Sequence, residues 1–386
     1  MTRKGVWGLQ DLRDKYLQSL WASDGLLFAW GYNAGALGVN DAPARSSPIQ
    51  IPGTKWSVSS MMDKTAASVR DDGTLWIWGY NGDGCLGLNQ PDNNRYSSPI
   101  QIPGTTWSGV KLTNERVTAT KSDGTMWAWG TNSAGSLGQN NETKYSSPVQ
   151  IPGTTWSDEF ATGNAHTLAV KTDGTLWAWG SGGNGRLGDN TSASKSSPIQ
   201  IPGTSWSKVS AGFKQSMAVR TDGTLWSWGE GVDGSLGHNN NSDYNSPRQI
   251  PGTTWAEPGC SYVWSGCVKT DGTLWTWGNN SVGNLGLNNR TNYSSPKQVS
   301  GTTWAYVYGN SGNPSSDTAA MATKTDGTLW TWGNQEDGTL GLSDLVKRSS
   351  PTQVGSDTTW KLHRHANGVA KRGMIAIKGT LTPSQM

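Results

Sequence analysis

The feature that most constrains the fold of this chain is a nine-residue motif that recurs along almost its whole length. In its fourth copy, Thr172 to Gly180, an Asp-Gly pair signals a β-hairpin, and the residues after it alternate between two faces as in a strand. The copies end in Trp-Gly about every 50 residues, at Trp30, Trp78, Trp129, Trp179, Trp228, Trp277 and Trp332. A repeat of this period indicates stacked supersecondary units in one closed body rather than separate domains.

One unit can be divided into strands from the same copy. We expect strands over 156–163, 166–171, 175–179 and 197–201, with the Asp173-Gly174 hairpin joining the second to the third. Pro198 fits an edge strand, where its missing N–H costs little. Four antiparallel strands with the proline-bearing strand outermost describe a propeller blade.

The third strand has apolar side chains on both faces. Leu176 and Ala178 point one way, and Trp177 and Trp179 point the other. Because neither face is polar, both faces must be covered. Blades packed face to face around an axis provide that cover, whereas a sheet with one wet face does not.

The count of units predicts seven blades. A tryptophan opens each unit after the first hairpin, at Trp56, Trp107, Trp156, Trp206, Trp255, Trp304 and Trp360. Because the chain begins and ends within a unit, we expect its two ends to combine into one blade and remove the free sheet edges. The predicted fold is all-β, a seven-bladed propeller of four-stranded antiparallel blades over residues 23–386. The strand Leu26–Gly31 and the tail Met374–Gly379 compete for one position in the closing blade, which the sequence leaves open.

Residues 1–22 stand apart from the repeats. Apolar residues at near-helical spacing predict a short amphipathic helix that either pads the end of the propeller or attaches it to a larger assembly. The candidate anchor residues are Val6, Trp7, Leu9, Leu12, Tyr16 and Leu20.

The amino-acid composition limits the classes of partner that the protein can have. Hydrophobic residues make up only 33% of the chain, but 23 Trp and 51 Gly indicate many short strands and an aromatic core rather than disorder. The 31 basic and 28 acidic residues nearly cancel in charge, which argues against a nucleic-acid partner. No stretch approaches 18 apolar residues, which argues against membrane insertion.

Three cysteines do not make a disulfide framework. We expect packing roles, with a Cys260–Cys267 bridge as the alternative.

The order Asp-Gly-Thr-Leu-Trp-Ala-Trp-Gly, Asn-x-x-Gly-x-Leu-Gly and Ser-Pro-x-Gln resembles the regulator of chromosome condensation (RCC1) repeat family over about residues 23–379. The resemblance implies a seven-bladed propeller closed by its two ends. Eukaryotic members include a nucleotide-exchange factor for a small GTPase that also binds chromatin. The resemblance implies that the exchange activity relies on a protruding wedge outside the repeats. This chain has no comparable insertion, its longest extension being Gly309 to Ser316, so the exchange activity is not expected.

The amino-acid sequence of the repeats also looks like that of bacterial and bacteriophage members of this family. In addition, Gly5-Val6-Trp7-Gly8-Leu9, followed by Leu12-Arg13-Asp14, resembles a segment of tailed-phage structural proteins. Together these two resemblances imply a virion protein, assembled in the host cytoplasm. Its partners would be other virion proteins or a host-surface ligand, and it would oligomerise through assembly.

Catalytic, cofactor and metal chemistry is not expected. The histidines do not accompany a nucleophile or a cysteine or aspartate cluster, so we interpret His166, His363 and His365 as structural. A basic residue precedes most hairpin aspartates by two positions, and we expect it to pair locally with that acid. The hairpin and strand residues Asp72, Gly73, Trp78, Asp173, Gly174 and Trp179 are predicted to be structural.

The variable loops between third and fourth strands are the candidate binding surface, because loops on a rigid scaffold carry recognition and Tyr with Asn, Ser and Arg forms adaptable contacts. The alternative is that these loops only keep the rim polar. The candidate residues are Asn89, Asp92, Arg95, Tyr96, Asn140, Lys144, Tyr145, His238, Asp243, Tyr244, Arg290 and Tyr293.

The sequence thus predicts a non-enzymatic structural or recognition module, with a tailed-phage tail, fibre or capsid-surface protein as the main interpretation. The first alternative is a soluble, cytoplasmic propeller that binds and regulates a partner enzyme or GTPase. A second alternative, an enzyme or lectin using the axial channel, requires clustered carboxylates or aromatics on the axis, and the repeat consensus does not supply them.

Overall fold

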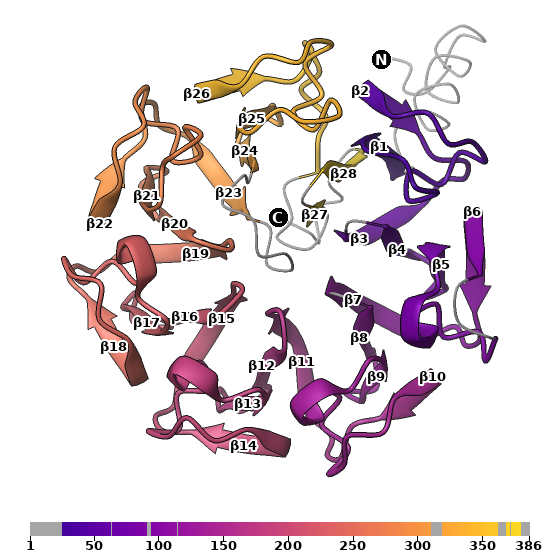
Figure 1. The fold of residues 1–386 in the computed structure, drawn as a ribbon, viewed down its shortest axis with the longest axis horizontal. Coiled ribbons are helices and arrows are strands. Elements are labelled where there is room, and N and C mark those ends of the chain that lie inside the picture. The colour runs from indigo at the N-terminus through magenta and orange to yellow at the C-terminus, as the bar shows by residue number, and fades with distance from the viewer. Residues whose placement is uncertain are drawn as a thin grey trace, which may run out of the picture.

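The computed structural model describes residues 25–62, 64–90, 94–113, 115–309, 319–361, 368–370 and 372–379. These residues form seven four-stranded antiparallel sheets arranged around a central axis (Figure 1). The predicted seven-bladed β-propeller is therefore confirmed. The predicted N-terminal helix with its anchor residues lies outside the described residues, as do Asp92, residues 310–316, His363 and His365.

Six blades each use four consecutive strands, which run from the axis outward. Blade 1 contains β3 (Trp56–Met62), β4 (Thr65–Arg70), β5 (Leu75–Tyr80) and β6 (Arg95–Ile102), and blade 2 contains β7 (Trp107–Thr113), β8 (Arg116–Lys121), β9 (Met126–Gly130) and β10 (Tyr145–Gln150). Blade 3 contains β11 (Trp156–Thr162), β12 (His166–Lys171), β13 (Leu176–Gly180) and β14 (Lys195–Ile201), and blade 4 contains β15 (Trp206–Ala211), β16 (Gln215–Arg220), β17 (Leu225–Gly229) and β18 (Tyr244–Ile250).

Blade 5 contains β19 (Trp255–Cys260), β20 (Trp264–Lys269), β21 (Leu274–Gly278) and β22 (Tyr293–Gln298), and blade 6 contains β23 (Trp304–Tyr308), β24 (Ala319–Lys324), β25 (Leu329–Gly333) and β26 (Arg348–Gln353). Short 3-10 turns follow the third strands of blades 1 to 4: η1 (Gly82–Gly84), η2 (Ser133–Gly135), η3 (Gly183–Gly185) and η4 (Val232–Gly234). The four strands predicted for blade 3 match the observed ones apart from their ends.

Blade 7 joins the two ends of the chain. Its strand order is β2 (Arg45–Gln50), β1 (Leu26–Gly31), β28 (Gly373–Lys378) and β27 (Gly368–Val369), so each end supplies two strands. The expectation that Leu26–Gly31 and the tail compete for one position is wrong, because the tail provides the second strand of the blade and β1 provides the third. The two strands pair in register from Leu26 with Lys378 to Gly31 with Gly373. Because β1 also pairs with β2 and β28 also pairs with β27, neither β1 nor β28 has an unpaired edge.

The Asp, Gly, Thr and Trp residues of the repeated motif stabilise the hairpin through local contacts. In blade 1 the Asp72 carboxylate accepts hydrogen bonds from the Thr74 backbone N–H (3.0 Å) and hydroxyl (2.6 Å). The Thr74 hydroxyl oxygen in turn accepts a bond from the indole of Trp76 at 2.9 Å. Gly73 adopts a φ of 75°, which favours glycine. The side-chain and backbone bonds from Thr74 lower the pKa of Asp72 below its ordinary value.

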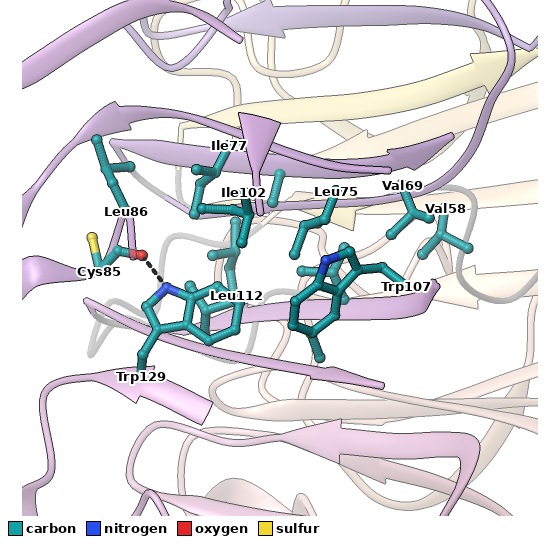
Figure 2. Packing of buried hydrophobic residues seen from close by; sticks show 14 of the residues in the cluster. Val58, Val69, Leu75, Ile77, Cys85, Leu86, Ile102, Trp107, Leu112 and Trp129 are labelled. Atoms are coloured by element: carbon teal, nitrogen blue, oxygen red, sulfur yellow. Dashed lines mark hydrogen bonds between the residues drawn. The ribbon is translucent and has the colours of Figure 1, made fainter. Parts of the chain in front are cut away.

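The core lies between neighbouring blades. Figure 2 shows Ile77 and Leu86 of blade 1 facing Trp107, Leu112 and Trp129 of blade 2. The indole of the Trp-Gly tryptophan donates to a loop carbonyl of the preceding blade: Trp78 to Ala36, Trp129 to Cys85, Trp228 to Arg186, Trp277 to Ser235, Trp332 to Asn284 and Trp30 to Thr339, all at 2.8–3.0 Å. The third strand is therefore covered on both faces, as predicted. In six of the seven blades its buried tryptophan also donates a hydrogen bond to the blade before it.

Strand register separates two faces of the propeller. At one end of blade 1, Leu75 pairs with Val69 and Ile102, and at the other end Gly79 pairs with Thr65 and Tyr96. We call the first end the hairpin face, because it holds the Asp-Gly hairpins and the Pro-Gly-Thr connections between blades. We call the second end the loop face, because it holds the loops between third and fourth strands and the turns between first and second strands.

The three cysteines are buried and none forms a disulfide, so the alternative of a Cys260–Cys267 bridge is wrong. Cys260 of β19 stands opposite Ser265, and Cys267 stands opposite Pro258. Diagonal positions on neighbouring strands hold their Cβ atoms about 7 Å apart, well beyond the ~3.8 Å of a disulfide. Among the described residues there is no helix long and apolar enough to cross a membrane.

Candidate functional site

The basic residues of the hairpin face lie between tryptophan rings. In blade 1 the Arg70 guanidinium carbon lies 4.4 Å from the ring centroid of Trp56 and 4.3 Å from that of Trp76. The same arrangement holds Lys121, Lys171, Arg220, Lys269 and Lys324, and in blade 7 it holds Lys378 between Phe28 and Trp360. The predicted local pairing with the hairpin aspartates is therefore wrong as the main contact. These cations stabilise the blades through cation–π contacts, and the hairpin face carries a repeated structural device.

Two of the predicted binding residues connect blades on the loop face through their backbone. The backbone N–H of Asn89 donates to Ser146 of the next blade at 2.8 Å, and that of Asn140 donates to Ser196 at 2.7 Å. Both asparagines have positive φ, near 55°, a conformation that asparagine tolerates well. The equivalent bond recurs at Asn40 to Ser97, Asn190 to Asn245, Asn239 to Ser294, Asn288 to Ser349 and Ser343 to Ser46. These bonds tie every blade to the next.

The loop tyrosines hold their own loops. The Tyr145 hydroxyl lies 3.1 Å from the amide nitrogen of Asn141, and the same pairing joins Tyr244 to Asn240 at 3.0 Å. Tyr293 is bound in the same way by Asn289 at 3.4 Å. The tyrosine rings are half-buried, so the loops present less aromatic surface than their sequences predict.

Two of the charged candidates also bridge blades. Lys144 pairs with Asp83 of blade 1 at 3.0 Å, and Asp243 accepts a bond from the side chain of Asn184 at 2.9 Å. Arg95 lies over the ring of Tyr80 within blade 1, and Tyr96 is half-buried opposite Gly79. Arg290 is exposed at the tip of its loop. His238 is the candidate that lines a groove, which is described below.

The loop face carries apolar residues that sequence reasoning did not select. The exposed large hydrophobic residues of the described chain are Val232, Leu345 and Val346, which are 42%, 68% and 56% exposed. All three lie on loops after third strands. None of the aligned loops has a large aliphatic residue at either position, and this departure from the repeat was the signal in the sequence. The residues equivalent to Leu345 are Ala42, Glu142, Ser192, Asn241 and Arg290, and those equivalent to Val346 are Pro43, Thr143, Ala193, Ser242 and Thr291.

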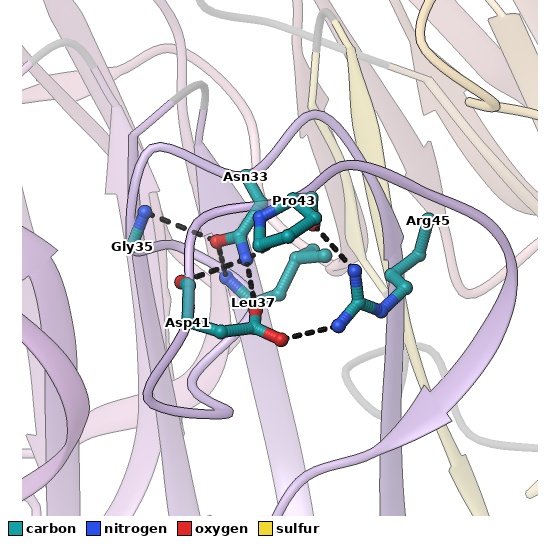
Figure 3. Close-up of polar contacts among 6 residues, drawn as sticks. All are labelled: Asn33, Gly35, Leu37, Asp41, Pro43 and Arg45. Carbon is teal, nitrogen blue, oxygen red and sulfur yellow. Dashed lines mark hydrogen bonds and ion pairs between the residues drawn. The ribbon is translucent and has the colours of Figure 1, made fainter.

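The loop that carries Leu345 is held rigidly. Asp344 forms an ion pair with Arg348 at 2.6 Å and accepts a bond from the Val346 backbone N–H at 2.9 Å. Figure 3 shows the equivalent loop of blade 7, where Asn33 binds Asp41 and Pro43, and Arg45 pairs with Asp41. The two loops are neighbours, because Ser343 donates its backbone N–H to the Ser46 carbonyl at 2.8 Å.

An aromatic pair lies on the turns of the loop face. Phe213 and Tyr262, from the turns of blades 4 and 5, meet edge to face with ring centroids 4.6 Å apart, and both are half-buried. Lys214 beside this pair forms an ion pair with Glu230 at 2.8 Å. The pair provides a rigid apolar feature closer to the axis than the outer loops.

Buried polar residues support these turns. The Arg116 guanidinium donates to the backbone carbonyls of Gly163 and His166 in the next blade, and burial lowers its pKa to about 10. Burial, with the nearby charges of Arg186 and Arg116, keeps the pKa of His166 well below its ordinary value, and its Nε2 lies 3.0 Å from the Ser216 hydroxyl. These contacts give His166 a structural setting.

The described residues leave a small cavity on the axis. This cavity, which is lined by first-strand residues, measures about 110 Å³, below the ~300–1,000 Å³ of typical small-molecule sites. Glu159 and Lys208 form an ion pair beside it at 2.9 Å. Within the described ranges, no group of three or more His, Cys, Asp or Glu residues is placed to hold a metal ion.

Comparison with known proteins places the chain among others of this architecture. Crystal structures with the same fold include human WBSCR16 (TM-score 0.79, 18% identity, 93% of this chain and 100% of that chain) and Kap60 bound to yeast RCC1, Prp20 (0.79, 18%, 100% and 96%). A third is Prp20p from Saccharomyces cerevisiae, described with its binding properties to Gsp1p and histones (0.80, 17%, 100% and 98%).

The sequence itself matches a family model. The regulator of chromosome condensation (RCC1) repeat model matches residues 72–111, 123–170, 173–219, 222–256, 271–307 and 326–361, and a second model with the same description matches residues 159–186. The matches follow the blades one after another and cover more than half of the chain. The protein therefore belongs to the RCC1 repeat family.

Proposed function

We propose that this protein is a non-enzymatic binding module that holds a protein partner, such as an enzyme or a small GTPase that it regulates, on its loop face. The observation that carries the proposal is the position of Val232, Leu345 and Val346 on that face, because exposed apolar residues on rigid supports mark interaction sites. The Phe213–Tyr262 pair adds an aromatic anchor of the kind enriched at interfaces.

The two faces differ in how much they repeat. The hairpin face shows the same arrangement of a cation between two aromatic rings in every blade, so it offers a partner seven similar surfaces. The loop face differs from blade to blade in its exposed residues, which gives an asymmetric partner one way to dock. Protein partners are also named for the structurally similar yeast protein, with Kap60 bound in one structure and Gsp1p and histones in the other.

The finer interpretation, a virion component of bacterial or bacteriophage type anchored by its first 22 residues, depends on a segment outside the described part of the chain. The similar solved structures come from human and yeast proteins, which favours the partner-binding alternative and its cytoplasmic location over the virion. Deletion of residues 1–22 separates the two. A virion anchor predicts loss of assembly into particles, whereas partner binding through the loop face survives the deletion.

Affinity capture from the organism that encodes the chain, followed by calorimetry with the purified partner, tests the proposal. A loop-face variant, Leu345→Asn with Val346→Thr, installs the residue types of Asn241 and Thr291 at the equivalent positions of other loops. It should weaken the partner complex about tenfold or more. Thr105→Asn, exposed on the hairpin face, is the matched control and should bind like wild type. Equal loss in both variants, or a partner whose affinity neither variant changes, would contradict the proposal.

A further inference from the structure

A groove on the circumference of the propeller separates blades 4 and 5. It lies between β18, the outer strand of blade 4, and the outer part of blade 5 that ends in β22 (Figure 1). Trp275, Ile250 and Pro296 give it apolar walls, and His238, Arg248 and Lys269 add polar groups. Its volume of about 440 Å³ lies within the range of small-molecule sites.

The sequence of the repeats shows what is particular to this groove. Arg248 occupies a fourth-strand position that holds Ile or Val in four other repeats, at Ile49, Ile100, Val149 and Ile199. His238 occupies the position of Val39, Leu88, Leu287 and Leu342, which pack as half-buried hydrophobic residues against their blade interfaces. Blades 7 and 1 are apolar at both positions, and the other four blades have one polar residue each, at Gln139, Asp189, Lys297 and Thr352. Blade 4 differs from all of them because it combines a basic residue and an aromatic polar residue at this seam.

The hydrogen bonds of His238 define its tautomer. The Ser227 hydroxyl lies 2.7 Å from the Leu236 carbonyl, which only accepts, so the single hydroxyl proton is used there. His238 Nε2, 2.9 Å from the Ser227 oxygen, must therefore carry the proton and donate it. This leaves Nδ1 as a hydrogen-bond acceptor on a neutral ring. Burial and the charge of Arg248 lower the pKa of His238 to about 4, which agrees with the neutral form.

Two cations line the groove, and none of its lining residues is acidic. Arg248 is exposed and lies over the ring of Tyr244, 4.6 Å from its centroid. Lys269 lies 4.8 Å from the ring centroid of Trp275, which is itself half-buried. The carboxylate of Asp271, two residues after Lys269, accepts hydrogen bonds from the backbone N–H and the hydroxyl of Thr273. The groove thus combines positive charge with a flat apolar wall.

We propose that this groove binds small aromatic acids. The aromatic ring of the ligand would pack against Trp275 and Pro296, and its carboxylate would lie between Arg248 and Lys269. An anion alone lacks the apolar contact, and a neutral ring lacks the charge-assisted bonds that are the stronger polar interactions. This inference goes beyond the proposed partner on the loop face, because none of the residues that carry that proposal lines the groove: Val232, Leu345, Val346, Phe213 and Tyr262 all lie outside it.

Ligand-observed NMR and calorimetry on the full chain test this inference, with 2-naphthoate as the probe. Naphthalene-2-carboxamide keeps the ring without the charge, and acetate keeps the charge without the ring. We expect 2-naphthoate to bind at least about tenfold more tightly than either, as expected for charged hydrogen bonds. Equal binding of the carboxamide, or no binding of 2-naphthoate at millimolar concentration, would overturn the proposal.

The repeats themselves supply variants that should fold. Arg248→Ile and His238→Leu install residues that other blades carry at the same positions, and thermal unfolding checks that each variant is intact. Arg248→Ile should lower the affinity for 2-naphthoate about tenfold or more. Lys297→Ile, the same change one blade further on, is the matched control and should leave the affinity unchanged. If Arg248→Ile binds like wild type, or Lys297→Ile loses as much affinity, the groove is not the site.

Discussion

The indole N–H of Trp30 donates a hydrogen bond of 2.9 Å to the backbone carbonyl of Thr339, 309 residues away in the sequence. This bond joins blade 7, which contains both chain ends, to blade 6. The same bond connects most neighbouring blades, but here it also closes the ring. Trp179 is the exception among these tryptophans, because its buried indole nitrogen has no hydrogen-bond partner in the structure.

This difference gives a direct test of the closing bond. Trp30→Phe and Trp179→Phe remove a similar ring volume from fully buried positions, but only Trp30→Phe leaves a carbonyl without its donor. We expect Trp30→Phe to lower the free energy of unfolding by about 1–3 kcal/mol more than Trp179→Phe. Urea unfolding followed by circular dichroism measures both. Equal destabilisation would show that the bond adds nothing beyond packing.

The cation between two tryptophans should stabilise each blade. Lys171 lies 4.8 Å from the ring centroid of Trp156 and 4.4 Å from that of Trp177. Lys171→Met keeps most of the aliphatic chain but removes the charge, and should cost about 1 kcal/mol of unfolding free energy. Lys171→Arg, the residue found at the equivalent positions 70 and 220, is the control and should remain near wild type. A neutral Lys171→Met would mean that only the aliphatic packing matters.

Stability should fall in acid because of the hairpin aspartates. Hydrogen bonds from the following threonine lower the pKa of Asp72, Asp123, Asp173, Asp222, Asp271 and Asp326 below 3.8. A pKa that is lower in the folded state gives stabilisation that is present above about pH 4 and is lost as the pH falls through the folded values. We expect the melting temperature to drop between pH 4 and pH 2.

A sixfold Asp→Asn variant isolates this contribution. Asparagine keeps the acceptor oxygen for the threonine but does not titrate, so its melting temperature should depend less steeply on acid. Differential scanning calorimetry at matched ionic strength compares the two proteins. An identical acid slope in the variant would assign the loss to other carboxylates.

The C-terminal strands should be required for a closed ring. Truncation after residue 361 removes β27 and β28 and exposes the edge of β1, an apolar strand of six residues. Unpaired apolar edges promote association between chains, so the truncated protein should aggregate or elute early in size-exclusion chromatography. Truncation after Gly379 keeps both strands and should elute like the full chain. If the protein that ends at residue 361 is monodisperse, the ring does not need the C-terminal strands for closure.

The architecture could be predicted from the sequence because it depends on local chemistry repeated seven times. Asp72, Gly73 and Thr74 make a hairpin through bonds between residues that are two positions apart, and the alternation of Leu176 with Trp177 requires cover on both faces. The repeat count then fixes the number of blades. Even the joining of the two ends followed from where the repeats begin and stop.

The tertiary structure alone decided how the remaining side chains are used. Arg70 meets Trp56 and Trp76 across three strands, so the cation that local sequence assigns to a nearby aspartate is held by two rings. Asn140, predicted to bind a partner, connects its blade to Ser196 of the next through its backbone N–H. Each contact joins residues that lie six or more positions apart and meet only after strand pairing and blade packing. The sequence thus determined the blade, whereas packing between strands and blades decided which loop residues were left exposed to bind anything else.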